Sequence, residues 1–394
     1  MKEISPEIFY VGVNDYETDL FESMWPLPEG VSYNAYVVKG TEKVAVIDTV
    51  KIPFVKEYLE KIEEVTSFDK IDYIILNHME PDHTGSLLKL LEKAPQAKIF
   101  CSKKAVSMVK SLFNLEENVH GVEEAEELDL GGKKLIFYMD PLVHWPETMV
   151  TYEVETKVLF SSDAFGSFKG LKEGITDEEV DYLSYIDETI RYFSNIVSKY
   201  TKYVKKALDK LLPLEIKVIA PAHGLIWKKD IKHIVSLYQR LANLEGEKNI
   251  LILWGSMYGN TKMVVDSVVE GIEEEGLKAI ILDVARDHLS YQIKETAKNQ
   301  GIILGFPTYD SEEFPPISFY LDMMRRKNIR NRVVGFFGSS LWSGRALKRA
   351  ADKLKVLDWQ IIEPLLEFRG KPTEELLTQA KELGKQVAQK VKEL

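Results

Sequence analysis

The sequence predicts an α/β protein with two domains. At 394 residues the chain is longer than one hydrophobic core usually organises. Its first half mixes short strand-like apolar runs with amphipathic helices, whereas from about residue 249 each apolar run is followed by a helical or loop segment. Such alternation is typical of a parallel, doubly wound sheet. Because the polar stretch 244–249 separates the two patterns, we expect domains at 1–246 and 247–394.

In the first half, apolar periodicity and turn residues define the elements. Residues 34–50 predict a β-hairpin that turns at Gly40-Thr41-Glu42-Lys43. Further strands are expected at 71–76, 97–101, 134–138, 149–155, 157–161 and 216–220. Helices are expected at 53–64, 85–93 and 104–112, with a long, mostly helical insertion at 177–212.

The second half predicts a five-stranded parallel sheet. Its β-rich runs are 250–254, 279–284, 301–305, 333–338 and 359–366. The last segment, 372–394, is an amphipathic helix with proline near its first turn, where the missing N–H costs little.

Composition narrows the class of protein. A formal net charge of −11 argues against nucleic acid or an anionic membrane as the main partner. The only cysteine, Cys101, excludes a disulfide framework, a thiolate zinc site and a cysteine-held iron–sulfur cluster. The N-terminus lacks an apolar signal region and no run reaches membrane-spanning length, so a cytoplasmic location is expected.

Ionisable residues gather where apolar strands end. His78-Met79-Glu80-Pro81-Asp82-His83 directly follows the 71–76 strand, and burying such groups unpaired would be costly. Three further residues occupy the ends of later strands. The candidate metal ligands are His78, Glu80, Asp82, His83, His144, Asp163 and His223. Histidine nitrogen combined with carboxylate oxygen suits iron or manganese as well as zinc.

A second cluster follows the first strand of the second half. Ser256-Met257-Tyr258-Gly259-Asn260-Thr261 leads into a helix, and backbone N–H groups at a helix start bind phosphate. Neither a triphosphate-loop lysine nor a dinucleotide glycine pattern follows, so a monophosphate such as FMN fits. The candidate flavin residues are Ser256, Met257, Tyr258, Gly259, Asn260, Thr261, Pro307, Thr308, Tyr309, Asp310, Ser339, Trp342 and Gly344.

The ligand pattern resembles the metallo-β-lactamase fold, with Glu80 where most hydrolases of that fold have a second histidine. In that difference the sequence resembles the flavodiiron proteins. The spacing of the ligands is also similar to that family: 60 residues separate His83 from His144, 18 separate His144 from Asp163, and 59 separate Asp163 from His223. The resemblance implies an αββα sandwich followed by a flavodoxin-like domain. It also implies two iron ions: His78, Glu80 and His144 on one, Asp82, His83 and His223 on the other, and Asp163 on both.

The same resemblance implies a reductase of O2 or NO. Two ferrous ions and a reduced flavin together supply four electrons, the number that converts O2 into two waters, and two electrons suffice to couple two NO into N2O. No catalytic residues beyond the metal ligands are assigned. The family resemblance further implies a head-to-tail homodimer or a higher even oligomer. Because rubredoxin-type cysteine pairs are missing, the electron donor is expected to be a separate protein such as rubredoxin, or coenzyme F420.

Two other functions stay open from the sequence. One is a zinc hydrolase with a flavodoxin appendage, against which Glu80 speaks. The other is an electron carrier or redox sensor whose first half is only a scaffold, against which the complete ligand set speaks. Residues that could border the substrate are Phe21, Glu22, Trp25 and Trp145.

Overall fold

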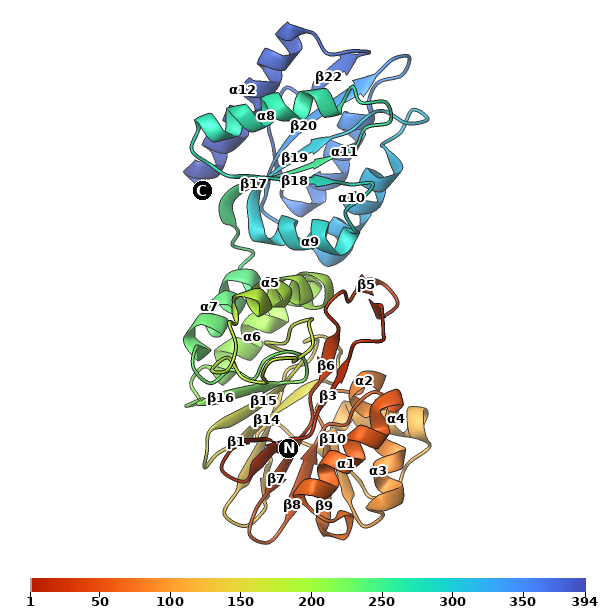
Figure 1. Cartoon of the computed structure of the whole chain (residues 1–394), viewed down its shortest axis with the longest axis vertical. Coiled ribbons are helices and arrows are strands. Elements are labelled where there is room, and N and C mark those ends of the chain that lie inside the picture. The colour runs from red at the N-terminus through yellow and green to blue at the C-terminus, as the bar shows by residue number, and fades with distance from the viewer. Residues whose placement is uncertain (1) are drawn as a thin grey trace. The chain divides into compact units, whose positions relative to one another are not determined.

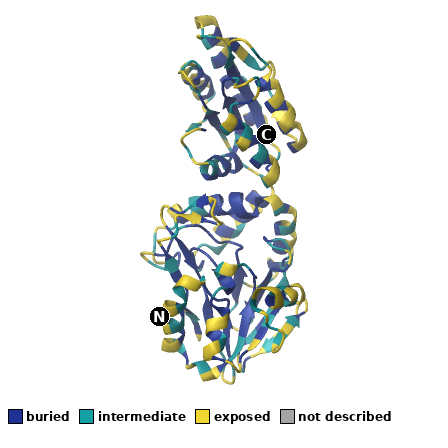
Figure 2. Ribbon diagram, turned by 90° about the vertical axis from the view of Figure 1, so that its right-hand side faces the viewer, coloured by how far each residue is buried: buried dark blue, intermediate teal, exposed yellow. Residues whose placement is uncertain are grey.

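The computed structural model describes residues 2–394, which form two compact units (Figure 1). The first unit runs up to Phe193 and includes Tyr200–Gln239. The second comprises Ser194–Lys199 and Arg240–Leu394. Each unit has its own buried interior (Figure 2). No helix within the described residues is long and apolar enough to cross a membrane.

A seven-stranded sheet forms one layer of the first unit. Its order is β1-β2-β7-β8-β9-β10-β11. The strands are β1 (Lys2–Ser5), β2 (Ile8–Tyr10), β7 (Tyr36–Lys39), β8 (Val44–Ile47), β9 (Ile71–Leu76), β10 (Lys98–Ser102) and β11 (Val119–Val122). Strands β7 and β8 pair antiparallel, which confirms the predicted hairpin. Strands β8 to β11 are parallel, so their carboxyl ends share one edge.

A five-stranded sheet forms the second layer, in chain order. Its strands are β12 (Glu127–Asp129), β13 (Lys134–Met139), β14 (Met149–Glu153), β15 (Val158–Ser162) and β16 (Val218–Pro221). The two layers meet where Tyr36 packs against Phe160, with ring centroids 5.1 Å apart. The Tyr36 hydroxyl also donates to the carbonyl of Pro221 at 2.7 Å.

Helices cover the outer sides of both sheets (Figure 1). Those near the seven-stranded sheet are α1 (Val55–Val65), α2 (Pro81–Thr84), α3 (Leu87–Lys93) and α4 (Lys103–Phe113). Those near the five-stranded sheet are α5 (Leu183–Tyr192), α6 (Thr201–Leu211) and α7 (Ile231–Ala242). Two short hairpins complete the unit: β3 (Val13–Asp15) with β6 (Val31–Tyr33), and β4 (Leu20–Phe21) with β5 (Trp25–Pro26). The result is the αββα sandwich that the family resemblance implied.

The second unit is a parallel sheet with the order β18-β17-β19-β20-β21. The strands are β17 (Glu247–Trp254), β18 (Ala279–Asp283), β19 (Asn299–Gly305), β20 (Val333–Ser340), β21 (Gln360–Ile361) and β22 (Leu366–Arg369). The helices are α8 (Lys262–Glu274), α9 (Leu289–Lys298), α10 (Pro315–Lys327), α11 (Ala346–Leu354) and α12 (Glu374–Glu393). Because the chain crosses from β18 over β17 to β19, the switch point lies between β17 and β19, where such folds bind ligands.

Glycines bring two helices of the second unit close together. A Cβ at Gly384 of α12 would collide with the carbonyl oxygen of Val268, and one at Gly271 of α8 with that of Lys381. The backbones therefore touch. Below this contact lies a core of β-branched and leucine side chains from both helices and the sheet, including Val264, Val268, Leu383 and Val387.

Three details differ from the sequence expectation. The run 359–366 forms two short strands, β21 and β22, which both pair with β20, with Pro364 between them. Proline lacks the N–H that a continuous strand would use. Strand β17 begins at Glu247, inside the expected linker 244–249. Strands β1 to β6, β11 and β12, and helix α7, were not anticipated.

Candidate metal and flavin sites

Strand ends of both sheets bring the seven predicted metal ligands together. The loop after β9 carries four of them, and His144, Asp163 and His223 follow β13, β15 and β16. Their ligand atoms form two groups, each within 4.8 Å internally. The groups are His78, Glu80, His144 and Asp163, and Asp82, His83 and His223.

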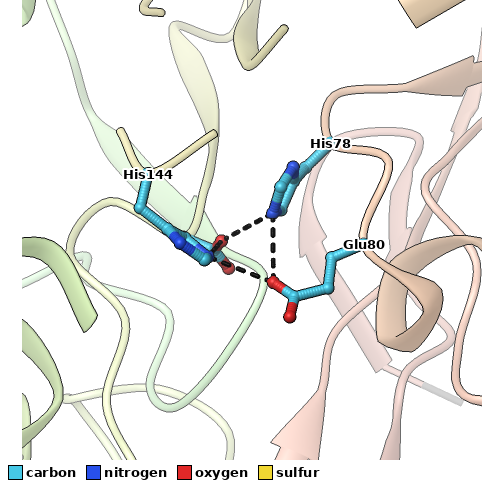
Figure 3. A group of neighbouring side chains, drawn as sticks. His78, Glu80 and His144 are labelled. Carbon is cyan, nitrogen blue, oxygen red and sulfur yellow. Dashed lines mark hydrogen bonds and ion pairs between the residues drawn. The ribbon is translucent and has the colours of Figure 1, made fainter. Parts of the chain in front are cut away.

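The first group is built around two carboxylates. Glu80 Oε2 lies 3.3 Å from Nε2 of His78 and 3.1 Å from Nε2 of His144. Asp163 Oδ2 lies 3.4 Å and 3.2 Å from the same two nitrogens. Figure 3 shows His78 and Glu80, from the loop after β9, and His144, from the loop after β13, reaching toward one point. Two ring nitrogens and two carboxylate oxygens therefore face one another.

The second group uses the other oxygen of Asp163. Its Oδ1 lies 3.1 Å from Nε2 of His83 and 3.4 Å from Nε2 of His223. Asp82 faces the same two rings, with Oδ1 at 3.4 Å from His83 and Oδ2 at 3.4 Å from His223. Asp163 thus presents one oxygen to each group, which is the geometry of a carboxylate shared by two cations.

The donor atoms are buried without conventional hydrogen bonds. Both oxygens of Asp82 and Asp163, and Nε2 of His83, His144 and His223, have no hydrogen-bond partner within residues 2–394. Leaving so many buried polar groups unsatisfied costs about 1–3 kcal/mol each. A pair of cations would satisfy all of them, and nitrogen with oxygen donors suits iron. The residues fit a dinuclear metal centre.

The pKa shifts have the same electrostatic cause. Burial lowers the pKa of His223, but the carboxylates of Asp163 and Asp82 outweigh burial and raise it to about 10. His144 behaves alike, and its pKa rises to about 9 beside Asp163 and Glu80. Burial raises the pKa of Glu80, whereas His144 and His78 lower it to about 2. The carboxylates thus stabilise positive charge at the ring nitrogens, the charge that a metal ion would bring.

Several residues around the cluster were not predicted. Glu147 Oε1 accepts a hydrogen bond from His78 Nδ1 at 2.8 Å, and the carbonyl oxygen of Ser32 lies 2.7 Å from His223 Nδ1. The ring of Tyr192 lies 5.5 Å from that of His223. Glu147 could have been found as an acidic residue three positions after His144, just before an apolar strand. Ser32 and Tyr192 carry no such signal, because a carbonyl and a buried tyrosine occur throughout proteins.

The four residues proposed to border the substrate separate into two pairs. The Phe21 ring lies 5.5 Å from His223, and the Trp145 ring lies 5.1 Å from His78. Both therefore line the cluster. Trp25 instead donates its indole N–H to Glu22 at 3.1 Å and is buried.

The predicted flavin residues lie at the carboxyl edge of the second sheet, in three loops and, for Ser339, at the end of strand β20. These loops follow β17, β19 and β20, the neighbouring parallel strands around the switch point. Two bonds join them: Thr261 Oγ1 lies 3.1 Å from Ser339 Oγ, and the N–H of Thr308 donates to the carbonyl of Ser339 at 2.8 Å. The other predicted residues, including Pro307, Asp310 and Gly344, belong to the same loops.

The loop after β17 has the features of a phosphate cradle. The N–H of Gly259 donates to Ser256 Oγ at 2.9 Å, which curls the loop. Gly259 has a φ of 94° with open space where a Cβ would stand. Helix α8 begins after Thr261 without a side-chain cap, so its first N–H groups suit an anion.

Aromatic side chains stand around this edge. Tyr258 is 92% exposed and Trp342 is 75% exposed, while Tyr309 and Met257 are partly exposed. Large exposed apolar groups gathered at a ligand edge are typical of a surface that a planar cofactor or a partner covers.

Comparisons with known proteins agree with both sites. Residues 31–224 match the family model of the ODP family beta lactamase, and residues 252–384 match that of flavodoxin. The chain is 30% identical over 392 residues to the anaerobic nitric oxide reductase flavorubredoxin of Pectobacterium atrosepticum, covering 98% of this chain and 76% of that protein.

Two solved structures are similar over the whole chain. The flavodiiron protein of Giardia intestinalis has a TM-score of 0.95 at 28% identity, covering 100% of this chain and 97% of that one. The rubredoxin oxygen:oxidoreductase of Desulfovibrio gigas has a TM-score of 0.94 at 28% identity, covering 100% and 98%.

A lactamase-like sandwich with a dinuclear ligand set, followed by a flavodoxin domain, defines a flavin-dependent metalloenzyme of the oxidoreductase class. The chain belongs to the flavodiiron protein family. The flavodoxin domain implies FMN, and flavodiiron relatives carry a diiron centre, so FMN and a pair of iron ions are the cofactors.

Proposed function

We propose that this protein reduces O2 to water, NO to N2O, or both, at a diiron centre that receives electrons through FMN. Two of its relatives carry these activities in their names, since one is an oxygen oxidoreductase and the other a nitric oxide reductase.

One observation carries the proposal: the two oxygens of Asp163 face two different ligand groups at 3.1–3.4 Å. We assign His78, Glu80 and His144 to one iron and Asp82, His83 and His223 to the other. Asp163 would offer one oxygen to each ion. Two ions that share a carboxylate would lie close enough for one small substrate to contact both.

Reduction of O2 to water requires a source of electrons in addition to the two metal ions. When bound, two ferrous ions and reduced FMN hold the four electrons that O2, with four protons, needs to become two waters. The three carboxylates of the ligand set offset the positive charge of two cations, which favours their oxidised state. Burial of the donor atoms keeps bulk water away from the substrate position.

FMN is proposed to bind at the carboxyl edge of the second sheet. The loop Ser256–Thr261 and the start of α8 would hold its phosphate. The loops with Pro307, Thr308, Tyr309 and Asp310, and with Ser339, Trp342 and Gly344, would contact its ring. The boundary between the metal and flavin domains is proposed to lie between residues 246 and 247, and the start of β17 at Glu247 supports it.

Electrons are proposed to come from a separate donor of the rubredoxin type, with coenzyme F420 as a second candidate. The name of the Desulfovibrio gigas relative states rubredoxin as its donor. We further propose that the protein works as a head-to-tail homodimer or a higher even oligomer, as the family resemblance implies.

The test combines cofactor analysis with anaerobic stopped-flow measurements. We expect about two irons and one FMN per chain, and rapid oxidation of the fully reduced protein by O2, NO or both. Asp163→Ala should lose most of its iron and lower turnover more than about 100-fold, since losing even an outer-sphere partner of a ligand costs 10–100-fold. A preparation with two zinc ions, and activity that does not depend on flavin, would instead support a hydrolase.

A further inference from the structure

Glu147 is a buried carboxylate that contacts the metal cluster from behind. Its Oε1 lies 2.8 Å from Nδ1 of His78, and the side chains of both residues are fully buried. The same oxygen accepts the backbone N–H of Met79 at 3.0 Å. The backbone of Glu147 is itself held, because Ser102 Oγ donates to its carbonyl at 2.6 Å. The carboxylate is therefore fixed relative to the His78 ring.

This contact determines which nitrogen of His78 faces the cluster. A carboxylate accepts hydrogen bonds only, so Nδ1 must carry the proton. The lone pair of a neutral ring then lies on Nε2, the atom that faces Glu80 and Asp163. A carboxylate behind a histidine also makes the ligating nitrogen a stronger donor.

Among the described residues, no carboxylate forms a hydrogen bond to Nδ1 of either histidine in the second ligand group. His223 Nδ1 lies 2.7 Å from the carbonyl oxygen of Ser32, an uncharged acceptor. His83 Nδ1 is buried without a hydrogen-bond partner within residues 2–394. The two groups share Asp163 and have one further carboxylate each, so Glu147 adds a negative charge in direct hydrogen bond to a ligand of the first group only.

We propose that Glu147 is a positioning residue that makes the two metal positions unequal. It orients His78 and strengthens it as a donor, so the position of His78, Glu80 and His144 holds its metal more tightly than that of Asp82, His83 and His223. The inference rests on the proposed dinuclear site, but not on which substrate is reduced.

Two other buried carboxylates near the cluster do not make this contact. Asp48 accepts from the N–H of Asn77 at 2.8 Å and from its side-chain amide at 3.1 Å. Asp140 is buried, and its oxygens have no hydrogen-bond partner in the described part of the chain. Asp140→Asn is therefore a matched control, because it changes a buried carboxyl group close to the first ligand group but leaves the bond to His78 in place.

The experiment is a titration of the metal-free, otherwise intact protein with cobalt(II), followed by absorption spectroscopy and calorimetry. The wild type should bind two ions in two unequal steps. Asp82→Ala should remove the weaker step and so assign it to the second group. Glu147→Gln should weaken the tighter step by about 10–100-fold and leave the weaker step within a few-fold. Asp140→Asn should leave both steps unchanged.

The alternatives give different results. Equal weakening of both steps by Glu147→Gln, no weakening at all, or the same effect from Asp140→Asn would overturn the role of Glu147. Circular dichroism of metal-free Glu147→Gln checks that it folds, and Glu147→Asp, which keeps the charge, gives a second variant if it does not. A wild type that binds two ions but reduces neither O2 nor NO would contradict the proposed function and leave the inference about Glu147 standing.

Discussion

The cluster of metal ligands differs from the carboxyl edge of the second sheet, where FMN is proposed to bind and which we call the flavin edge, in the kind of group that would bind the cofactor. Seven side chains from four strand-end loops form the cluster, and five of them, Asp82, His83, His144, Asp163 and His223, have buried donor atoms without a hydrogen-bond partner among the described residues. At the flavin edge, the binding features are backbone N–H groups, a glycine with positive φ and exposed aromatic rings. The cluster therefore depends on side-chain identity, whereas the flavin edge depends on backbone shape and tolerates more side-chain change.

The largest expected effect is the loss of stability when metal is removed. A ligand that binds only the folded state at a thousandfold excess over its Kd contributes about 4 kcal/mol. Chelation under anaerobic conditions should therefore lower the melting temperature of the first unit and leave the flavin unit unchanged. Differential scanning calorimetry, with flavin fluorescence marking the second unit, measures both transitions.

Asp163→Ala provides the control for this experiment. Because it removes the shared carboxylate, its first unit should melt at nearly the same temperature with and without iron. An equal shift of both transitions in the wild type would show that metal binding stabilises the whole chain, and the comparison between two independent sites would fail.

A smaller effect is expected from Gly384→Ala in the second unit. The added methyl group would collide with the carbonyl oxygen of Val268 and push α12 away from α8. Overpacking of this kind typically costs about 1–3 kcal/mol. Urea unfolding followed by flavin fluorescence should show the loss, with unchanged iron content.

Glu382→Ala serves as the matched control on the same helix. Glu382 is exposed, so its replacement should change the unfolding free energy by less than about 0.5 kcal/mol. If Gly384→Ala proved as mild as this control, the close backbone contact of the two helices would be unnecessary for the fold.

The smallest effect is expected from Trp342→Ala at the flavin edge. An aromatic contact of this type contributes about 0.5–1.5 kcal/mol, which corresponds to roughly 2–10-fold weaker FMN binding. Quenching of FMN fluorescence by the flavin-free protein measures the Kd. Leu341→Ala, an exposed neighbour, should bind FMN like the wild type. A loss of binding above about 100-fold would show that a side chain, and not the backbone, carries this site.

Much of the molecule could be predicted from the sequence because its signals are local. The alternation of strands and helices predicts the second unit. The metal ligands could be predicted because they are ionisable residues that follow apolar strands. His78 and His83, only five positions apart, needed no tertiary information to be grouped. The phosphate loop is equally local, since one strand, one loop and one helix start define it.

Other features depend on contacts between distant segments and left no local signal. Strands β1 to β6 are too short for a clear period. The sequence by itself determined which residues could bind metal and flavin, because residue type and strand-end position suffice for that. Only the tertiary structure decided that the two oxygens of Asp163 face different groups and that Glu147 lies behind His78, because these contacts join residues up to 85 positions apart in the chain.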